Sequence, residues 1–516
     1  MRINERKLGT VLSYLQMGLG TLISLIYTPL MLRLLGQSEY GLYNTVSSTI
    51  SMLSLLNLGF GSGYVRYYAQ YKKENNREAI YRLNGLFLTI FAVIGAVALA
   101  CGLFISAHLE MVFDSGLTEN EYNLARTLMT LLTVNLAVSF PMSVFSNIVS
   151  ASERFVFLKL LGILKTVVSP LLTVPLLLMG FRSVALVIST MVISLLTDIL
   201  YLYYVLFVLK NRFIFQGFEP GLLKTLFAYT VFIAMNLVVD QINNNLDKFL
   251  LGRFNGTAAT AIYSVGFALY HYDMMFSTAI CAVFTPRVHL LIQETGADPS
   301  LRTERLTELF TKVGRIQFLV LGLVTSGLVF FGKQFIVNIW AGPAYEEAYY
   351  VMLLLVLPSM VPFIQNLGIE IQRAQNKHQF RSIAYLIMAA VNFALTVALC
   401  PRYGAVGATV GTAISLLLAN GLVINIYYHK QCNIDIIAFW KSILRLAAGL
   451  LPPILLGLIL MVSFKELSIL QYLAAIAAYT AVYCLSMWCL GMNHYEKSLV
   501  RSAVRAVMKR RKARRT

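Results

Sequence analysis

The chain has 516 residues, of which 58% are hydrophobic and only 13% are charged, and its mean hydropathy is +0.70. Soluble domains are nearly half apolar and about a quarter charged, so this composition excludes a soluble globular protein. The net charge of +18 does not indicate a nucleic-acid partner, because the charges lie in short loops between apolar segments and not on one solvated face. The sequence predicts an integral membrane protein.

Apolar segments of roughly 20 residues recur along the whole chain, each long enough to cross about 30 Å of hydrocarbon as a helix. They lie near residues 8–32, 42–65, 84–106, 125–150, 158–180, 183–208, 225–250, 258–285, 316–338, 347–371, 382–400, 405–428, 446–463 and 469–490. The basic start MRINERK leads into a first segment that is longer than the core of a signal peptide, so we expect it to be retained. The predicted fold class is an all-α integral membrane protein with about 14 transmembrane helices.

The distribution of lysine and arginine predicts the orientation. Alternate loops carry 33 of these residues on the side of the N-terminus and 8 on the opposite side, and the remaining one, Lys165, lies within a span. The positive-inside rule places the richer side in the cytoplasm. We therefore expect a multi-pass protein of the bacterial cytoplasmic (inner) membrane with both termini cytoplasmic.

The sequence repeats itself with a period of about 220 residues. Residues 36–43 (GQSEYGLY) match residues 256–263 (GTAATAIY), and residues 151–157 (ASERFVF) match residues 374–380 (AQNKHQF). Each copy holds an even number of spans, so the copies face the same way and are parallel repeats about an axis along the membrane normal. Such pairs usually enclose a cavity.

The repeat predicts four parts of the chain. These are an N-terminal six-helix lobe (1–210), a C-terminal six-helix lobe (211–430), two extra transmembrane helices (431–492) and a basic cytoplasmic tail (493–516). The tail ends in MKRRKARRT, which would attract anionic lipid at the inner leaflet or would simply be solvated.

Four motifs resemble those of a known family. They are the turn LLGQSEYGLYNTV, the glycine-rich second span NLGFGSGYVRYYAQYKKE, the ASERF loop and YGAVGATVGTAIS in the twelfth span. Together they resemble the Wzx-type polysaccharide-repeat flippases of the multidrug/oligosaccharidyl-lipid/polysaccharide (MOP) exporter superfamily. The resemblance implies two lobes around a central cavity and alternating access. It implies an undecaprenyl-diphosphate-linked oligosaccharide of O-antigen or capsule synthesis as cargo.

A stripe of polar residues marks the seventh span. Its members fall at steps of three or four, which would place them on one helix face: Asn236, Asp240, Asn243, Asn244 and Asp247. Such a face cannot lie against lipid, so we expect the three amides to bind cargo and the two carboxylates to couple transport to H⁺ or Na⁺. The alternatives are hydrogen bonds between packed helices for the stripe and a cation on another helix for Asp240.

Other spans add weaker candidates. Tyr270 and His271 in the eighth span, and Gln16 and Tyr27 in the first, are candidate cargo contacts on milder polar stripes. The further candidates for ion coupling are two carboxylates within spans, Asp273 and Asp198. Asp198 has no visible partner, although a water molecule or a hydroxyl could satisfy it.

A diphosphate cargo requires cations on the cavity wall. Arg66 closes the second span and Arg287 follows the eighth at an offset of 221 residues, so one would lie on each lobe at the cytoplasmic mouth. A guanidinium group suits phosphate because it donates two parallel hydrogen bonds. The alternative is that both residues only follow the positive-inside rule.

The absence of nucleotide and hydrolase motifs in the sequence restricts the function. The sequence contains no GxxxxGK[ST], HExxH or GxSxG, so we expect no enzyme activity, cofactor or metal. The alternative functions are a cation-coupled multidrug exporter of the same superfamily and a scaffold for polymerase and glycosyltransferase partners. The first span holds no carboxylate, which disfavours the exporter, and the buried carboxylates disfavour the scaffold.

Overall fold

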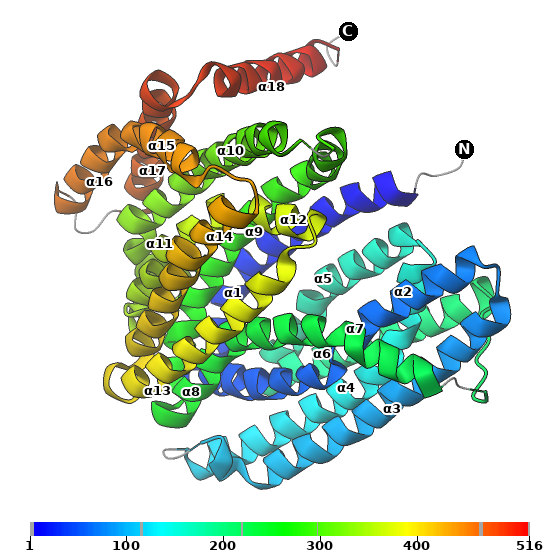
Figure 1. The fold of residues 1–516 in the computed structure, drawn as a ribbon. Coiled ribbons are helices and arrows are strands. Elements are labelled where there is room, and N and C mark those ends of the chain that lie inside the picture. Colours follow the sequence, from blue (N-terminus) through cyan, green and yellow to red (C-terminus); the bar gives the residue numbers. More distant parts are fainter. Residues whose placement is uncertain (1–4, 114–116, 218–219, 297, 464–467, 514–516) are drawn as a thin grey trace. The chain divides into compact units, whose positions relative to one another are not determined.

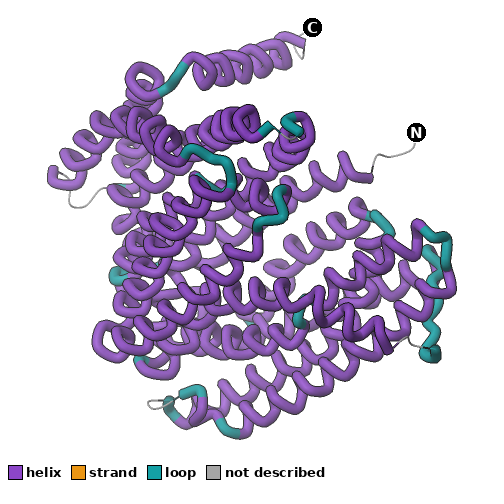
Figure 2. Tube along the Cα trace, in the orientation of Figure 1, coloured by secondary structure: helices purple, strands orange, loops and turns teal. Residues whose placement is uncertain are grey.

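We describe the protein from a computed structural model, over residues 5–113, 117–217, 220–296, 298–463 and 468–513. Every regular element in these ranges is a helix (Figures 1 and 2), as predicted. The α-helices are α1 (Glu5–Met52), α2 (Phe60–Lys73), α3 (Arg77–Ala107), α4 (Glu119–Ala151), α5 (Phe155–Leu178), α6 (Arg182–Tyr203), α7 (Pro220–Gln241), α8 (Asp247–Phe254), α9 (Gly256–Glu294), α10 (Pro299–Gln334), α11 (Ala348–Ile364), α12 (Leu367–Ala374), α13 (His378–Leu416), α14 (Ile424–Gln431), α15 (Ile436–Ala447), α16 (Leu451–Ser463), α17 (Ile469–Ser486) and α18 (His494–Ala513).

The described helices are long and apolar enough for the predicted spans. Ten helical segments in the described ranges could each cross a membrane, and two bent helix pairs raise the number to 12. Two of the ten, Leu8–Lys73 and Gln379–Gln431, have 66 and 53 residues. Each is well over twice the length that one crossing needs and contains two of the predicted segments. All the predicted segments therefore fall on helices.

The outer surface of these helices is apolar. Large apolar side chains are exposed on the first and the last two predicted spans, with Ile26, Val462 and Leu470 exposed by 75%, 78% and 80%. Apolar exposure on this scale would drive a soluble protein to aggregate. In a bilayer the same side chains contact lipid tails, while the helical backbone satisfies its own hydrogen bonds.

Two glycines break the helices at matching places in the repeat. Gly36 lies inside α1 with φ of 76°, and Gly256 separates α8 from α9 with φ of 80°. Only glycine adopts this left-handed region without a steric cost. The first matching pair of sequence segments therefore has the same backbone turn in both copies.

These two turns, residues 36–45 and 256–263, pack against each other. A Cβ atom on Gly41 would lie 1.8 Å from the carbonyl oxygen of Thr257, so only glycine permits this approach. The hydroxyl oxygens of Ser38 and Thr257 are 2.9 Å apart, and Thr45 Oγ1 donates to Thr260 Oγ1 at 3.1 Å. We call this contact the paired turns.

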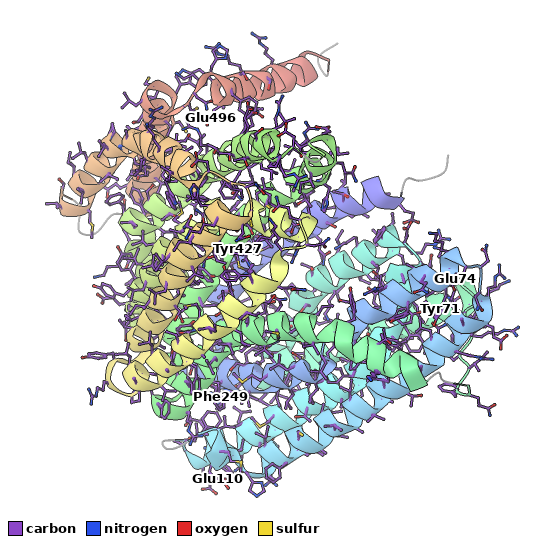
Figure 3. The ribbon with its side chains drawn as sticks, in the orientation of Figure 1. Tyr71, Glu74, Glu110, Phe249, Tyr427 and Glu496 are labelled. Atoms are coloured by element: carbon purple, nitrogen blue, oxygen red, sulfur yellow. The ribbon has the colours of Figure 1, made fainter. Side chains whose placement is uncertain are left out.

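The second pair of matching segments also shares one backbone conformation. Helix α4 ends at Ala151 and α5 begins three residues after Ser152, with Glu153 at φ of 60°. Helices α12 and α13 are joined in the same way, with Asn376 at φ of 56°. In the second copy Tyr427 (Figure 3) donates its hydroxyl hydrogen to the carbonyl of Lys377 at 3.1 Å. The repeat seen in the sequence is thus visible in the backbone.

Packing divides the chain into two compact units. Unit 1 comprises Met1–Val265 and Tyr385–Thr412, and unit 2 comprises Gly266–Ala384 and Ala413–Thr516. An aromatic core in unit 1 includes the buried rings of Tyr64, Phe87 and Phe91 from α2 and α3. A core in unit 2 includes Phe331, Tyr472 and Tyr479 from α10 and α17. The lobe boundaries near residues 210 and 430 stay predictions.

Candidate functional site

A buried carboxylate in unit 1 is surrounded by hydroxyl groups. Asp247 is the first residue of α8 and is only 2% exposed. Its carboxylate accepts hydrogen bonds from Tyr263 Oη at 2.8 Å, Thr412 Oγ1 at 2.7 Å and, more weakly, Thr396 Oγ1 at 3.3 Å. Tyr263 comes from α9 and the two threonines from α13, so three helices meet at this group.

Glycines in α13 bring its two halves together at this site. The helix breaks at Gly404, where φ is 56°, and the residues before and after the break pack side by side. A Cβ atom on Gly407 would lie 2.5 Å from the carbonyl oxygen of Leu399, and one on Gly411 would lie 2.9 Å from Thr396 Oγ1. Small residues four apart are how membrane helices approach closely. They place Thr396 and Thr412 beside one carboxylate.

The cluster holds more acceptor oxygens than donated hydrogens. Besides the carboxylate, Asn392 Oδ1 lies 3.2 Å from both threonine hydroxyls, and the carbonyl oxygen of Ala408 lies 3.5 Å from both. Three hydroxyl hydrogens thus face four acceptor oxygens, and the ammonium group of Lys248 interacts electrostatically with the carboxylate. A proton or a hard monovalent cation would relieve this excess, because such cations take carboxylate, amide, hydroxyl and carbonyl oxygens as ligands. We call these residues the Asp247 cluster.

Asp273 lies in a different environment in unit 2. It is fully buried on α9, and its Oδ2 accepts one hydrogen bond from Thr325 Oγ1 of α10 at 3.3 Å. Its Oδ1 has no hydrogen-bond partner among the described residues. One weak donor supports a buried carboxylate much less than the three donors at Asp247 do.

Asp198 has a cationic neighbour that the sequence did not reveal. Lys165 on α5 donates to Ser194 Oγ on α6 at 3.3 Å, and its ammonium group interacts electrostatically with Asp198 one helical turn further on. Lys165 therefore points toward α6. Asp198, for which the sequence showed no partner, has this ammonium group as its neighbour.

The polar residues of the seventh span do not share one environment. Asn236 and Asp240 on α7 and Asn244 after it are exposed, Asn243 is half-buried, and Asp247 is buried. A π-helical turn over Ile242–Leu246 causes the difference, because its i→i+5 bonding adds a residue to the turn and rotates the residues after it. The expectation of one continuous face is therefore wrong at Asp247. Asn244 Nδ2 also donates to the Asp240 carbonyl at 2.7 Å.

The candidates on the first span pack against α5. A Cβ atom on Gly162 would lie 2.5 Å from Gln16 Nε2, so the amide fills the space that this glycine leaves. Tyr27 lies beside Thr173, three turns further along α5. Both contacts lie within unit 1, and a role in binding cargo stays a prediction for both residues.

The two arginine candidates have different surroundings. The guanidinium of Arg66 on α2 lies over the ring of Tyr229 on α7, 4.4 Å from its centre, which is a cation–π contact. Arg287 on α9 forms an exposed ion pair with Glu294 at 2.8 Å. Arg66 belongs to unit 1 and Arg287 to unit 2. Both side chains are exposed, and phosphate binding by them stays a prediction.

Tyr270 and His271 belong to an aromatic group in unit 2. The Tyr270 ring stacks on Phe363 of α11, with 5.8 Å between ring centres. The Phe267 ring lies 5.4 Å from the Tyr270 ring and 6.4 Å from the His271 ring. Sugar rings stack on aromatic surfaces of this kind, and that role stays a prediction here.

Three residues of the Asp247 cluster were missing from the sequence-based candidates. Asn392, Thr396 and Thr412 lie on α13, 145 or more residues from Asp247 in sequence. The available signal was the glycine spacing in YGAVGATVGTAIS, which indicates a close helix contact without naming its partner. No group of three or more His, Cys, Asp or Glu residues in the described ranges is placed to hold a metal ion.

The sequence matches one known family. The family model described as "Polysaccharide biosynthesis protein" matches residues 8–289, which is more than half of the chain. No curated protein matches the sequence.

Solved structures share the fold. A structure titled "Lipid II flippase MurJ, inward closed conformation" has a TM-score of 0.71 at 15% identity, covering 93% of this chain and 97% of that one. An inward-facing multidrug resistance MATE transporter of the MOP superfamily has a TM-score of 0.62 at 14% identity, covering 82% and 96%. A MOP superfamily transporter from Pyrococcus furiosus has 0.57 at 15%, covering 85% and 97%. At these identities the likeness shows the fold alone.

Proposed function

The chain belongs to the polysaccharide biosynthesis protein family, and from that premise we propose that it is a flippase for undecaprenyl-diphosphate-linked oligosaccharide units. It would carry them across the bacterial cytoplasmic membrane by alternating access, for O-antigen or capsule export. The match to the lipid II flippase structure over 93% of the chain supports a lipid-linked cargo. Glycosyltransferases would supply this cargo and a polymerase would consume it.

The Asp247 cluster carries the proposal that transport is coupled to a cation. Its oxygens come from α8 and from both halves of α13, so a bound H⁺ or Na⁺ would hold these elements together. Without the cation, the excess of acceptor oxygens would push the same elements apart. A ligand that binds one arrangement better shifts the protein toward it, which is what coupling requires.

The paired turns support alternating access. They are equivalent parts of the two repeats, and they meet through glycine, alanine and small hydroxyl residues that separate without exposing large apolar side chains. The lysine and arginine distribution predicts that they lie on the outer side of the membrane. Their contact would close the outer end of the transport path while the inner end is open.

A cation-coupled drug exporter is the second candidate. The buried carboxylate of Asp273, with one hydroxyl donor and aromatic residues one turn away, favours it. The family match favours the flippase, because it covers 282 residues of this chain.

The two functions are separated by what accumulates when the gene is deleted. We expect a deletion strain to accumulate undecaprenyl-linked oligosaccharide on the inner leaflet, and the native chain to release it. An Asp247→Asn chain, expressed at the native level, would fail to release it, because the amide lacks the ligand charge on which cation affinity depends.

The matched control is Asp298→Asn, which removes a carboxylate charge from the exposed N-terminal cap of α10. It should restore export fully. Sensitivity of the deletion strain to cationic drugs, with export intact, would establish the exporter and refute the flippase. Normal export by Asp247→Asn would refute only the coupling site.

A further inference from the structure

Helix α15 presents an open groove at one end of unit 2. It buries Phe439, Ile443 and Leu446 against the unit and exposes Ile437 and Leu444 by 71% and 69%. The groove beside it has a volume of about 620 Å³ and is lined by Ile436, Ile437, Trp440, Lys441, Leu444 and Arg445. It therefore combines an apolar floor with two cations one helical turn apart.

The cations of the groove are available to a ligand. Lys441 and Arg445 are exposed, and neither pairs with a carboxylate among the described residues. Trp440 donates its indole hydrogen to Asn425 Oδ1 at 3.2 Å, which fixes the ring in the groove. Tryptophan, lysine and arginine above an apolar surface are typical of the level of the lipid headgroups.

Helix α18 carries a second basic surface directly after the last span. Lys497, Arg501 and Arg505 repeat at four-residue steps and so lie on one side of the helix. The first two lie over the Trp488 ring, at 5.9 and 5.6 Å from its centre. Trp488 belongs to the short π-helical end of the last span, residues Met487–Gly491, so α18 begins at the edge of the membrane.

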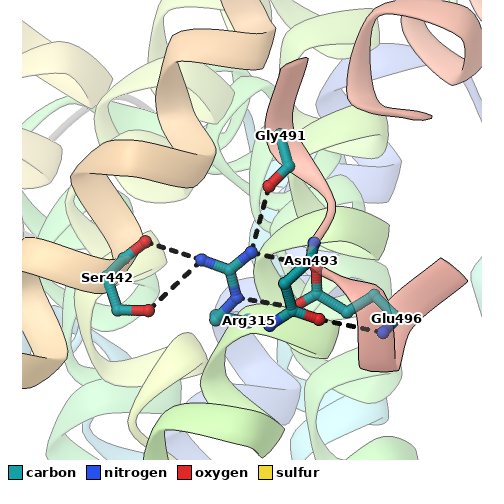
Figure 4. A network of polar contacts seen from close by, with 5 residues as sticks. All are labelled: Arg315, Ser442, Gly491, Asn493 and Glu496. Carbon is teal, nitrogen blue, oxygen red and sulfur yellow. Dashed lines mark hydrogen bonds and ion pairs between the residues drawn. The ribbon is translucent and has the colours of Figure 1, made fainter. Parts of the chain in front are cut away.

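A buried ion pair connects the helix of the groove, α15, to the start of the basic helix α18 (Figure 4). Arg315 on α10 is 5% exposed and pairs with Glu496 of α18, with nitrogen–oxygen distances of 2.5 and 2.9 Å. The same guanidinium donates to the carbonyl of Ser442 on α15 at 2.8 Å and to that of Gly491 at 3.0 Å. Figure 3 labels Glu496 near the start of α18, and Figure 1 shows α18 extending from α17 toward the C-terminus.

The ion pair leaves α18 with positive charge only. Glu496 is the one acidic residue in residues 493–516, against nine lysines and arginines, and Arg315 neutralises it. Tyr495, Leu499 and Val500 on the same helix are exposed by 36% to 40%. A basic helix with apolar side chains that begins at the membrane edge lies in the interface and attracts anionic lipid.

We propose that the α15 groove and α18 together bind anionic phospholipid of the surrounding bilayer, with acyl chains on Ile437 and Leu444 and phosphates at the five cations. An acidic protein partner would need charge complementarity but not the apolar floor, and a nucleic acid would need a basic surface clear of the membrane. The site does not depend on the cargo or on the coupling ion.

The test measures which lipids the purified full-length chain retains. The protein is exchanged into mixed micelles with equal phosphatidylglycerol and phosphatidylcholine of the same acyl chains, and bound lipids are counted by native mass spectrometry. We expect the native chain to prefer phosphatidylglycerol. Lys441→Gln with Arg445→Gln, and separately Lys497→Gln with Arg501→Gln and Arg505→Gln, should each reduce the preference by about fivefold per cation, the equivalent of about 1 kcal/mol.

The matched control removes three exposed cations, Lys72, Lys73 and Arg77, from the turn between α2 and α3. It should keep the native preference, and gel filtration and melting temperature should show that every variant is folded. No preference in the native chain, as expected for a protein partner, would overturn the proposal. So would equal losses in the control and the site variants, which would indicate unspecific attraction to charge.

Discussion

Three of the four buried carboxylates in the described ranges have clearly different environments. Asp247 accepts hydrogen bonds from three hydroxyls, Glu496 faces a guanidinium, and Asp273 has one hydroxyl donor. The hydroxyls hold the Asp247 carboxylate without neutralising it, and the ammonium group of Lys248, which interacts with it electrostatically, can lose its proton. A guanidinium neutralises a carboxylate permanently, because arginine does not lose its proton. The first arrangement suits an exchangeable ion, and the second suits a structural anchor.

The anchor leads to a prediction about stability. Arg315→Met alone leaves Glu496 buried without its cation, and we expect the free energy of unfolding to fall by about 3–5 kcal/mol. The double variant Arg315→Met with Glu496→Met should recover most of this loss, because apolar residues of similar volume replace a buried pair at little cost. Unfolding in mixed detergent, followed by circular dichroism, measures both changes.

The comparison pair for this prediction is Arg82 and Glu78, which are four residues apart on α3 with side chains 46% and 65% exposed. Arg82→Met should cost less than about 1 kcal/mol, since exposed pairs contribute little. Equal losses in the single and the double variant at Arg315 would show that the arginine acts through its bonds to Ser442 and Gly491 and not through Glu496.

At the scale of the element, helix breaks decide the geometry, and the sequence reveals only some of them. The repeat aligns Gly36 with Gly256, and both glycines lie at helix breaks with a positive φ. The π-helical turn after Gln241 was not predictable, because one extra residue in a helical turn leaves no mark on hydropathy. That turn rotates Asp247 away from the face of the other polar residues in the seventh span, the pattern from which Asp247 was predicted.

The paired turns give a prediction about conformation. In a chain without its native cysteines, Ser38→Cys with Thr257→Cys should form a disulfide, because the hydroxyl oxygens at these positions are 2.9 Å apart. The bond would hold the outer end closed, so we expect transport to stop and to return on reduction. The measurement is release of inner-leaflet oligosaccharide with and without reductant.

A substitution at Gly41 tests whether the disulfide depends on the close approach of the paired turns. Adding Gly41→Ala should lower the yield of the disulfide by about 5- to 150-fold, since overpacking costs about 1–3 kcal/mol and the obstacle is a backbone carbonyl that cannot rotate away. Gly18→Ala, with nothing within 4 Å of the new methyl group, is the control in the same helix. A disulfide that forms freely but leaves transport intact would exclude the turns as a gate.

For the whole molecule, long apolar runs determined most of what the sequence could predict. Each of the predicted spans falls on a helix, because crossing a bilayer demands a length of apolar residues that can be counted. The residues of the Asp247 cluster could not be found by counting in this way. Asp247 was named from its own helix, but Thr396 and Thr412 join it through contacts between distant segments, and a single sequence does not record such contacts.

The number of spans gives the last prediction, since 10, 12 and 14 spans all leave both termini on one side. The 14-span count and the two lower counts predict opposite sides of the membrane for two residues. These are Glu74, in the turn after α2, and Glu110, after α3 (Figure 3). With the N-terminus in the cytoplasm, as the lysine and arginine distribution predicts, two crossings by Leu8–Lys73 would leave Glu74 cytoplasmic and Glu110 outside. In a cysteine-free chain in intact spheroplasts, an impermeant maleimide should therefore label Glu110→Cys and leave Glu74→Cys unlabelled until lysis. The opposite pattern would mean that this 66-residue segment crosses only once, and the loops between it and the second long segment, Gln379–Gln431, would then lie on the other side of the membrane.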